Sequence, residues 1–174
     1  YYQEKCCVIR LKDETDVLTV FNAVQELYDR FDAWRDRLQD ILDRSASVEE
    51  MLTASYEIFE TPMFLIDENF QFLAHCGTDD SVGSGAWTSS AQDNLSLPEL
   101  GKFLELHELE TSEREPMILN ILDSTTLNVN LFDKDTYLGC LTLDYRERTH
   151  RLGDVELAKL LAAMLTRAIL KFSS

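Results

Sequence analysis

The chain has 174 residues, of which 45% are hydrophobic, so it can form one folded domain with a full core plus an extension. Acidic residues outnumber basic ones 32 to 16 and give a net charge of −16, which argues against direct binding of nucleic acid by this segment. No apolar run reaches the ~20 residues that a membrane span requires, and no stretch resembles a signal peptide.

The four cysteines show neither a CxxC pair nor a metal-ligand spacing with histidine. Cys6 and Cys7 are adjacent, whereas Cys76 and Cys140 are far apart. We therefore expect reduced thiols that pack as small apolar groups in a cytoplasmic protein, without a cofactor or a metal ion. The sequence starts with Tyr1 and not Met, so we also expect it to be part of a longer protein.

Residues 6–11 (CCVIRL) are typical of a short strand. This strand either joins the main sheet or ends an upstream domain, and we assign residues 1–12 to it as a separate unit. A turn follows, and residues 13–46 form the next unit.

A long helix is predicted between Thr15 and Arg44, where no Gly or Pro interrupts the sequence. Apolar residues recur there every seven positions in two rows: Val17, Val24, Phe31, Leu38 and Val20, Leu27, Trp34, Ile41. Such a helix is ~45 Å long and cannot bury its whole stripe inside a small domain. We expect much of it to meet another helix, from a second copy of the chain. A two-stranded parallel coil would place Arg30 near Arg35 of its partner, so a four-helix contact fits better.

The third unit, residues 47–172, begins with a capping box formed by Ser47 and Glu50, which predicts a helix to about Phe59. Apolar runs at 63–66 and 70–76 flank a short polar turn and predict a β-hairpin. Residues 77–94 are rich in Gly and Ser and predict a loop, after which a second capping box predicts a helix from residue 96 to about 109.

Three further strands are predicted at 117–122, 125–132 and 137–145, followed by a final helix. Asp154 is its expected N-cap, and a broad apolar stripe reaches Phe172, so this helix can lie beside the first long helix. The fold class is therefore α+β: a five-stranded antiparallel sheet with long N- and C-terminal helices on one face and the 77–109 segment over the other. A homodimer through the helices 15–44 and 154–172 is expected.

Alternation of side chains along the strands separates the two faces of this sheet. The apolar face should pack on the long helices, with Gly139 allowing a close approach. The opposite face holds Leu138 and a polar set: Asn120, Asn128, Asn130, Cys140 and Thr142. These residues either line a small-molecule site or face water, and the pattern leaves both open. Trp87 is either a lid over this site or an anchor for its loop.

No catalytic set is recognisable in the sequence. His75 and Cys76 are neighbours on a strand and point to opposite faces, so they do not form a dyad. A thiol-dependent enzyme that uses Cys76 or Cys140 is the weakest of three hypotheses, and we expect no enzymatic activity. The other two are a ligand-sensing regulatory domain and a purely structural dimerisation module.

Several segments together resemble the GAF-like sensor part of PucR-type bacterial transcriptional regulators. They are the stretch TPMFLIDENFQFLAHC, the strand YLGCLTL, the closing helix GDVELAKLLAAMLTRAIL and the preceding helix FNAVQELYDRFDAWRDRLQDIL. The resemblance covers residues 13–172 and implies a GAF/PAS-like fold. It also implies a dimeric, cytoplasmic, non-enzymatic sensor of a small molecule, which acts on a helix-turn-helix DNA-binding domain outside this chain.

Overall fold

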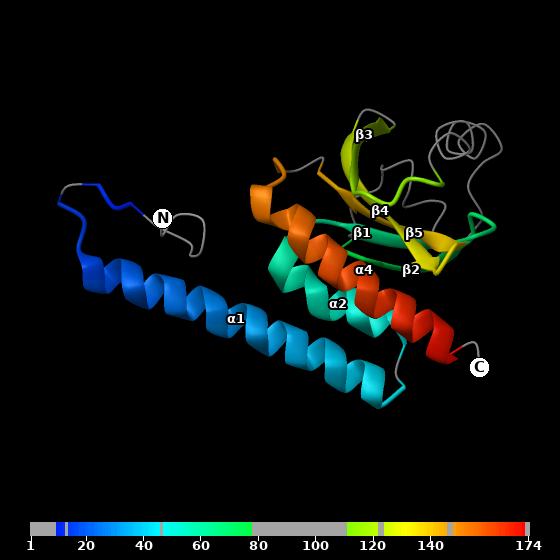
Figure 1. Cartoon of the computed structure of the whole chain (residues 1–174), viewed down its shortest axis with the longest axis horizontal. Helices are drawn as coiled ribbons and strands as arrows, with labels where there is room; N and C mark the ends of the chain where they lie inside the picture. Colours follow the sequence, from blue (N-terminus) through cyan, green and yellow to red (C-terminus); the bar gives the residue numbers. More distant parts are fainter. Residues whose placement is uncertain are drawn as a thin grey trace.

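The computed structural model describes residues 10–12, 14–45, 47–77, 111–121, 124–145 and 148–172. Its centre is a five-stranded sheet in the order β2-β1-β5-β4-β3 (Figure 1). The strands are β1 Met63–Asp67, β2 Phe72–Cys76, β3 Met117–Ile121, β4 Ser124–Asp133 and β5 Thr136–Asp144. Every neighbouring pair is antiparallel, so the predicted antiparallel sheet and the hairpin formed by β1 and β2 are confirmed.

Three described helices accompany the sheet: α1 Val17–Asp43, α2 Val48–Phe59 and α4 Leu152–Phe172. Asp16 caps α1, because its carboxylate accepts hydrogen bonds from the backbone N–H groups of Leu18 and Thr19. Ser47 caps α2 by accepting from the N–H of Glu50, as the capping box predicts.

The start of α4 differs from the prediction. Asp154 is not the N-cap, because the helix begins two residues earlier, at Leu152. Its carboxylate instead reaches back from the first turn and accepts a hydrogen bond from the backbone N–H of Arg151 at 2.9 Å. The Asp154 side chain therefore still satisfies a backbone N–H group at the N-terminus of α4, but from a position inside the helix.

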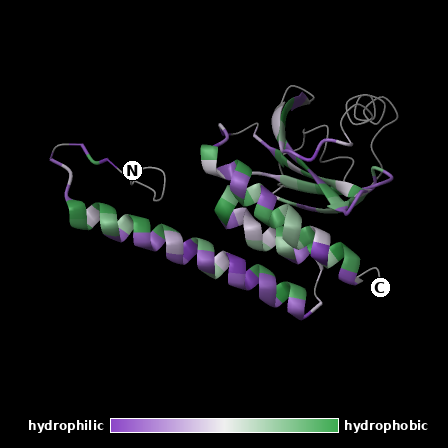
Figure 2. Ribbon diagram, viewed as in Figure 1, coloured by the Kyte–Doolittle hydropathy of each residue, from purple (hydrophilic) through white to green (hydrophobic). Residues whose placement is uncertain are grey.

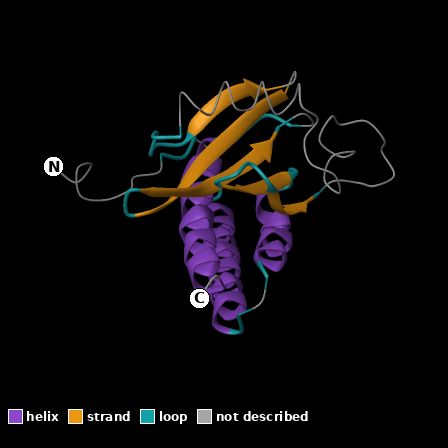
Figure 3. Ribbon diagram, turned by 90° about the vertical axis from the view of Figure 1, so that its right-hand side faces the viewer, coloured by secondary structure: helices purple, strands orange, loops and turns teal. Residues whose placement is uncertain are grey.

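All three helices lie on one face of the sheet (Figure 3). The core between the two layers combines the apolar face of the strands with the helices, and its fully buried members include Leu127, Leu131, Leu141, Leu143, Leu161 and Leu165. The predicted division of the sheet into an apolar helix-facing side and a polar side is therefore correct for these strands.

The helix α1 is only half embedded in this core. Its C-terminal half buries Trp34, Leu38, Ile41 and Leu42. The ring of Trp34 meets Phe59 edge-on at 5.9 Å, and its Nε1 donates to the hydroxyl of Ser55 at 3.0 Å. The C-terminal half of the heptad stripe on α1 is therefore covered by α2 of the same chain. The helix α4 lies beside α1 as expected, and Lys171 Nζ donates to the Leu42 carbonyl at 2.7 Å.

The N-terminal half of α1 extends beyond the other helices, and parts of its ribbon have the colour of hydrophobic residues (Figure 2). We call residues 17–28 the arm. Its large side chains are exposed by the following fractions: Val17 66%, Leu18 70%, Phe21 63%, Leu27 48% and Tyr28 66%. Just after the C-terminal end of the arm, the guanidinium of Arg30 donates to the carbonyl of Glu57 near the end of α2.

Some predictions fall outside the described part of the chain. The strand at 6–11 lies almost wholly there, and the loop at 77–94, the helix at 96–109 and Trp87 lie there as well, apart from Gly77. Within the described ranges, no helix has both the length and the hydropathy that crossing a bilayer requires.

Candidate functional site

Three of the polar side chains predicted on the second face of the sheet, those of Asn128, Cys140 and Thr142, are buried and lie within hydrogen-bond reach of one another. Asn128 is fully buried on the inner strand β4. Its amide donates to the hydroxyl of Thr126 at 2.7 Å, and its carbonyl oxygen accepts from the hydroxyl of Thr142 at 2.8 Å. The thiol of Cys140 lies 4.0 Å from that same hydroxyl. The water-facing alternative is therefore wrong for these residues, which form a buried polar network across β4 and β5.

Asn130, two residues after Asn128 on β4, bonds instead to the segment that precedes β3. Its amide nitrogen donates to the carbonyl of Glu113 at 3.0 Å. The neighbouring Arg114 places its guanidinium 4.5 Å from the centre of the Phe132 ring and pairs with Asp135 at 2.9 Å. Three interactions therefore hold the segment 111–116 over one end of the polar face: the hydrogen bond from the Asn130 amide, the cation–π contact and the exposed ion pair.

A β-bulge changes the predicted alternation at this same end. Leu131 pairs with Gly139, whereas Phe132 pairs with Tyr137, so Leu138 is an extra residue on β5. Leu138 packs against the helix-side core, and its predicted place on the polar face is wrong. Tyr137 is turned onto the polar face instead, where its ring meets Phe132 at 5.9 Å.

Gly139 makes this bulge possible. Its φ is +146°, and a Cβ atom there would lie 2.0 Å from the carbonyl oxygen of Ile66 on β1. The close approach that we predicted at Gly139 is therefore toward a neighbouring strand and not toward the helices. Only glycine suits this backbone position, which fixes where Tyr137 points.

Tyr137 is a residue of the site that the sequence pattern missed. Its hydroxyl oxygen is buried and has no hydrogen-bond partner among the described residues. Burial raises the pKa of this phenol, and the nearby Cys140, Asp67 and Glu68 raise it further. The group therefore stays neutral and able to donate, and a buried hydroxyl without a partner marks a place where another molecule can bind.

The remaining predicted residues lie elsewhere or are not described. Asn120 is exposed on the edge strand β3, where it accepts a hydrogen bond from the Thr125 hydroxyl at 3.1 Å. The structure therefore brings Asn128, Asn130, Cys140 and Thr142 together and separates Asn120 from them. Trp87 lies outside the described residues.

The two described thiols are not activated. Burial raises the pKa of the Cys76 thiol to about 12 and that of the Cys140 thiol to about 12. A nucleophilic cysteine needs a lowered pKa, so neither thiol has the surroundings that thiol catalysis requires. Among the residues that the structure describes, no cluster of His, Cys, Asp and Glu is arranged to hold a metal ion.

Comparison with solved structures identifies the class of fold. A methyl-accepting chemotaxis protein, residues 122 to 287, matches with a TM-score of 0.51 and 18% identity, over 80% of this chain and 96% of that one. The GAF domain of an Acinetobacter phosphoenolpyruvate-protein phosphotransferase matches with a TM-score of 0.51 and 17% identity, over 81% and 94%. The corresponding GAF domain from Coxiella burnetii gives a TM-score of 0.48 and 16% identity, over 82% and 96%.

The fold of this chain is therefore an α+β fold of the GAF type, with a five-stranded antiparallel sheet and helices on one face. The sequence matches no protein-family model. No curated protein is significantly similar to it in sequence.

Proposed function

We propose that this chain is a ligand-sensing regulatory domain of a cytoplasmic bacterial transcriptional regulator of the PucR type. A small molecule binds against the polar face of the sheet, and the change reaches a DNA-binding domain outside this chain through the helices. The acidic composition supports a regulatory role that does not involve contact with DNA by this segment. GAF domains as a class are ligand-sensing regulatory domains, and this chain shares their fold.

The observation that carries this proposal is the buried Tyr137 hydroxyl, which has no hydrogen-bond partner among the described residues. A buried polar group without a hydrogen bond costs free energy, so a folded protein retains one where it has a use. Here a bulge, and Gly139 at a φ of +146° that only glycine suits, direct the group onto a buried polar face. Such devices are frequent beside binding sites, because they aim one side chain without altering the rest of the sheet.

Binding is tested with a panel of metabolites by thermal shift and native mass spectrometry, on the wild type and on Tyr137→Phe. We expect one chemical class to raise the melting temperature of the wild type, and this response to shrink in Tyr137→Phe. Tyr28→Phe is the matched control, because Tyr28 lies on the arm and is 66% exposed. A panel that leaves the wild type unchanged and never appears bound in mass spectra would refute ligand sensing.

We further propose that the chain forms a homodimer through α1 and α4. The arm exposes five large apolar side chains on one helix, and isolated apolar surface of this kind marks an interaction site. Leu160 and Leu170 add exposed apolar surface on α4, at 37% and 38%. Within this chain Arg30 donates to the Glu57 carbonyl and Arg35 pairs with Asp32 at 3.2 Å, so both cations have partners on their own protomer.

Sedimentation tests this association directly. We expect the wild type to sediment as a dimer, and the double variant Phe21→Ser/Tyr28→Ser to dissociate because it removes two exposed aromatic rings from the arm. Leu73→Ser is the control, since Leu73 is 42% exposed on the edge strand β2, away from both helices. A wild type that remains monomeric at high concentration would contradict the dimer.

A structural dimerisation module is the second candidate. The observation in its favour is that Asn128, Thr126 and Thr142 satisfy one another without a ligand. A dimer that persists while no compound binds would select this candidate over ligand sensing.

A further inference from the structure

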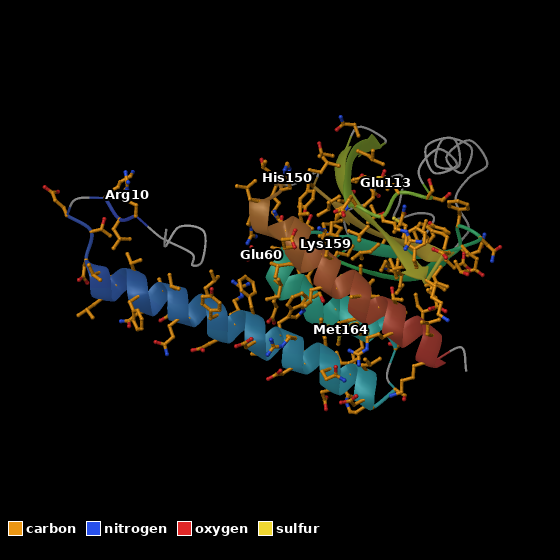
Figure 4. The ribbon with its side chains drawn as sticks, viewed as in Figure 1. Arg10, Glu60, Glu113, His150, Lys159 and Met164 are labelled. Carbon is orange, nitrogen blue, oxygen red and sulfur yellow. The ribbon has the colours of Figure 1, made fainter. Side chains whose placement is uncertain are left out.

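Three elements of the fold meet at one buried carboxylate. Asp154 is 2% exposed and lies in the first turn of α4. Its Oδ2 accepts from the hydroxyl of Tyr145 at 3.0 Å and from the backbone N–H of Arg151 at 2.9 Å, and it pairs with Nη1 of Arg148 at 2.9 Å. Tyr145 directly follows β5, so this oxygen joins the end of the central strand to the start of the C-terminal helix. Figure 4 labels Glu60 and His150 near this end of the helical layer.

Arg148 connects the same carboxylate to α2. Its Nε donates to the carbonyl of Phe59 at 2.9 Å, its Nη2 donates to that carbonyl as well, and its guanidinium lies 4.7 Å from the centre of the Tyr145 ring. The Phe59 carbonyl belongs to the last turn of α2, where acceptors lack helical partners and a positive charge is favourable. We call Tyr145, Arg148, Asp154 and the Phe59 carbonyl the junction.

The junction differs from the apolar contacts along the middle of α4, because its bonds are directional. Elsewhere the buried face of α4 is apolar, with Ala158, Leu161, Leu165 and Ala168. Apolar contacts depend on buried area and tolerate small sliding movements. Charge-assisted hydrogen bonds fix distance and angle, and those of the junction are shielded from water, since the side chains of Arg148 and Asp154 are 18% and 3% exposed.

The strand β5 connects the polar network of the sheet to the junction. Cys140 and Thr142 lie in the polar network, and Tyr145, three residues after Thr142, reaches α4 through Asp154. We propose that the junction transmits displacements of β5 to α4 and to the end of α2, and so couples the polar face of the sheet to the helical layer. This regulatory role rests on the proposed function, because a ligand on the polar face is what would displace β5.

The protein contains its own reporter for this coupling. Trp34 on α1 meets the ring of Phe59, whose carbonyl Arg148 holds. The sequence has two tryptophans, so Trp87→Phe leaves Trp34 as the only one. Incorporated 5-fluorotryptophan then gives a single ¹⁹F resonance that senses the end of α2.

The test uses Thr142→Val as the perturbation of the polar face, so it needs no ligand. In the Trp87→Phe background we expect Thr142→Val to shift the ¹⁹F resonance of Trp34, and Asp154→Asn to reduce that shift by at least half. Tyr145→Phe removes a single hydrogen bond to the same carboxylate, keeps the experiment informative should Asp154→Asn not fold, and is expected to reduce the shift too. Lys159→Met is the control on the same helix, because it breaks an exposed ion pair with Glu115 and should leave the shift intact.

Two results would overturn the proposal: a Trp34 resonance that ignores Thr142→Val, or a shift of unchanged size in the junction variants. Neither result bears on whether a metabolite binds, since no ligand is present. Conversely, a metabolite panel without a hit would refute ligand sensing and leave this coupling measurable.

Discussion

Replacing Tyr137 by Phe should stabilise the protein, which is unusual for a truncation at a buried site. The hydroxyl oxygen is buried without a partner among the described residues, so the folded state bears its desolvation cost and the unfolded state does not. The ring itself remains in Tyr137→Phe, and with it the edge-on contact to Phe132 at 5.9 Å. The substitution therefore removes an unfavourable contribution and leaves the packing unchanged.

The magnitude follows from the cost of an unsatisfied buried polar group, about 1–3 kcal/mol. Since the ring of Tyr137 is only partly buried, we expect a gain of about 1 kcal/mol in the free energy of unfolding. Tyr145→Phe makes the same chemical change at the residue that directly follows this strand, with the opposite expectation. Its hydroxyl donates to the Asp154 carboxylate at 3.0 Å, so we expect a loss of about 1.5–3 kcal/mol.

Urea denaturation of the wild type and both variants measures these changes, with the slope m compared to exclude an altered denatured state. The comparison is internally controlled, because each variant loses one oxygen atom from a tyrosine. A Tyr137→Phe protein that is less stable than the wild type by 1 kcal/mol or more, roughly the net value of one hydrogen bond, would show that this hydroxyl is bonded and would remove the main support for the ligand site.

Three further outcomes follow from the same geometry. Gly139→Ala should lower the free energy of unfolding by roughly 2–4 kcal/mol, because the new Cβ would lie 2.0 Å from a backbone oxygen. Gly153→Ala is the control: nothing lies within 4 Å of its Cβ, so it should be neutral or slightly stabilising. Urea denaturation compares the two variants. Stability should fall as pH rises from 9 toward 12, by up to about 1.4 kcal/mol per pH unit for each buried thiol. Burial raises the pKa of the Cys76 and Cys140 thiols from 9.0 to about 12 in the folded state, so their contribution to stability is complete below pH 9 and is lost as pH rises toward 12. The double Cys→Ala variant should show a smaller dependence of stability on pH in the same denaturation experiment. Asn128→Ala should lower the free energy of unfolding by about 2–4 kcal/mol in the same assay. Combined with Thr142→Val it should lower it by less than the sum of the two single losses, because both substitutions remove the same hydrogen bond.

Local patterns in the sequence were sufficient to predict the antiparallel sheet and the three helices that the structure describes. The Ser47 cap, the turn after β1 and the alternation along β4 each depend on a few neighbouring residues, so the sequence carries them directly. The polar face could be predicted for the same reason, since Asn128, Asn130, Cys140 and Thr142 follow a simple period of two.

The details that escaped prediction depend on contacts between distant segments. The bulge at Leu138 arises from the pairing of β5 with both β1 and β4, and only there does Gly139 approach Ile66. A glycine within a predicted strand was the one available sign of it. The position of Asp154 likewise depends on Arg148 and Tyr145, which the sequence separates from it by several residues.

The division of α1 between an embedded half and the arm has a consequence for the order of the arm itself. A helical segment of about 12 residues is marginal in water without tertiary support. Just C-terminal to the arm, the guanidinium of Arg30 ties α1 to α2 through the Glu57 carbonyl. Dilution of the proposed dimer should therefore unwind α1 from Val17 to about Arg30, so that the loss of helical circular dichroism and the loss of association would follow one concentration curve.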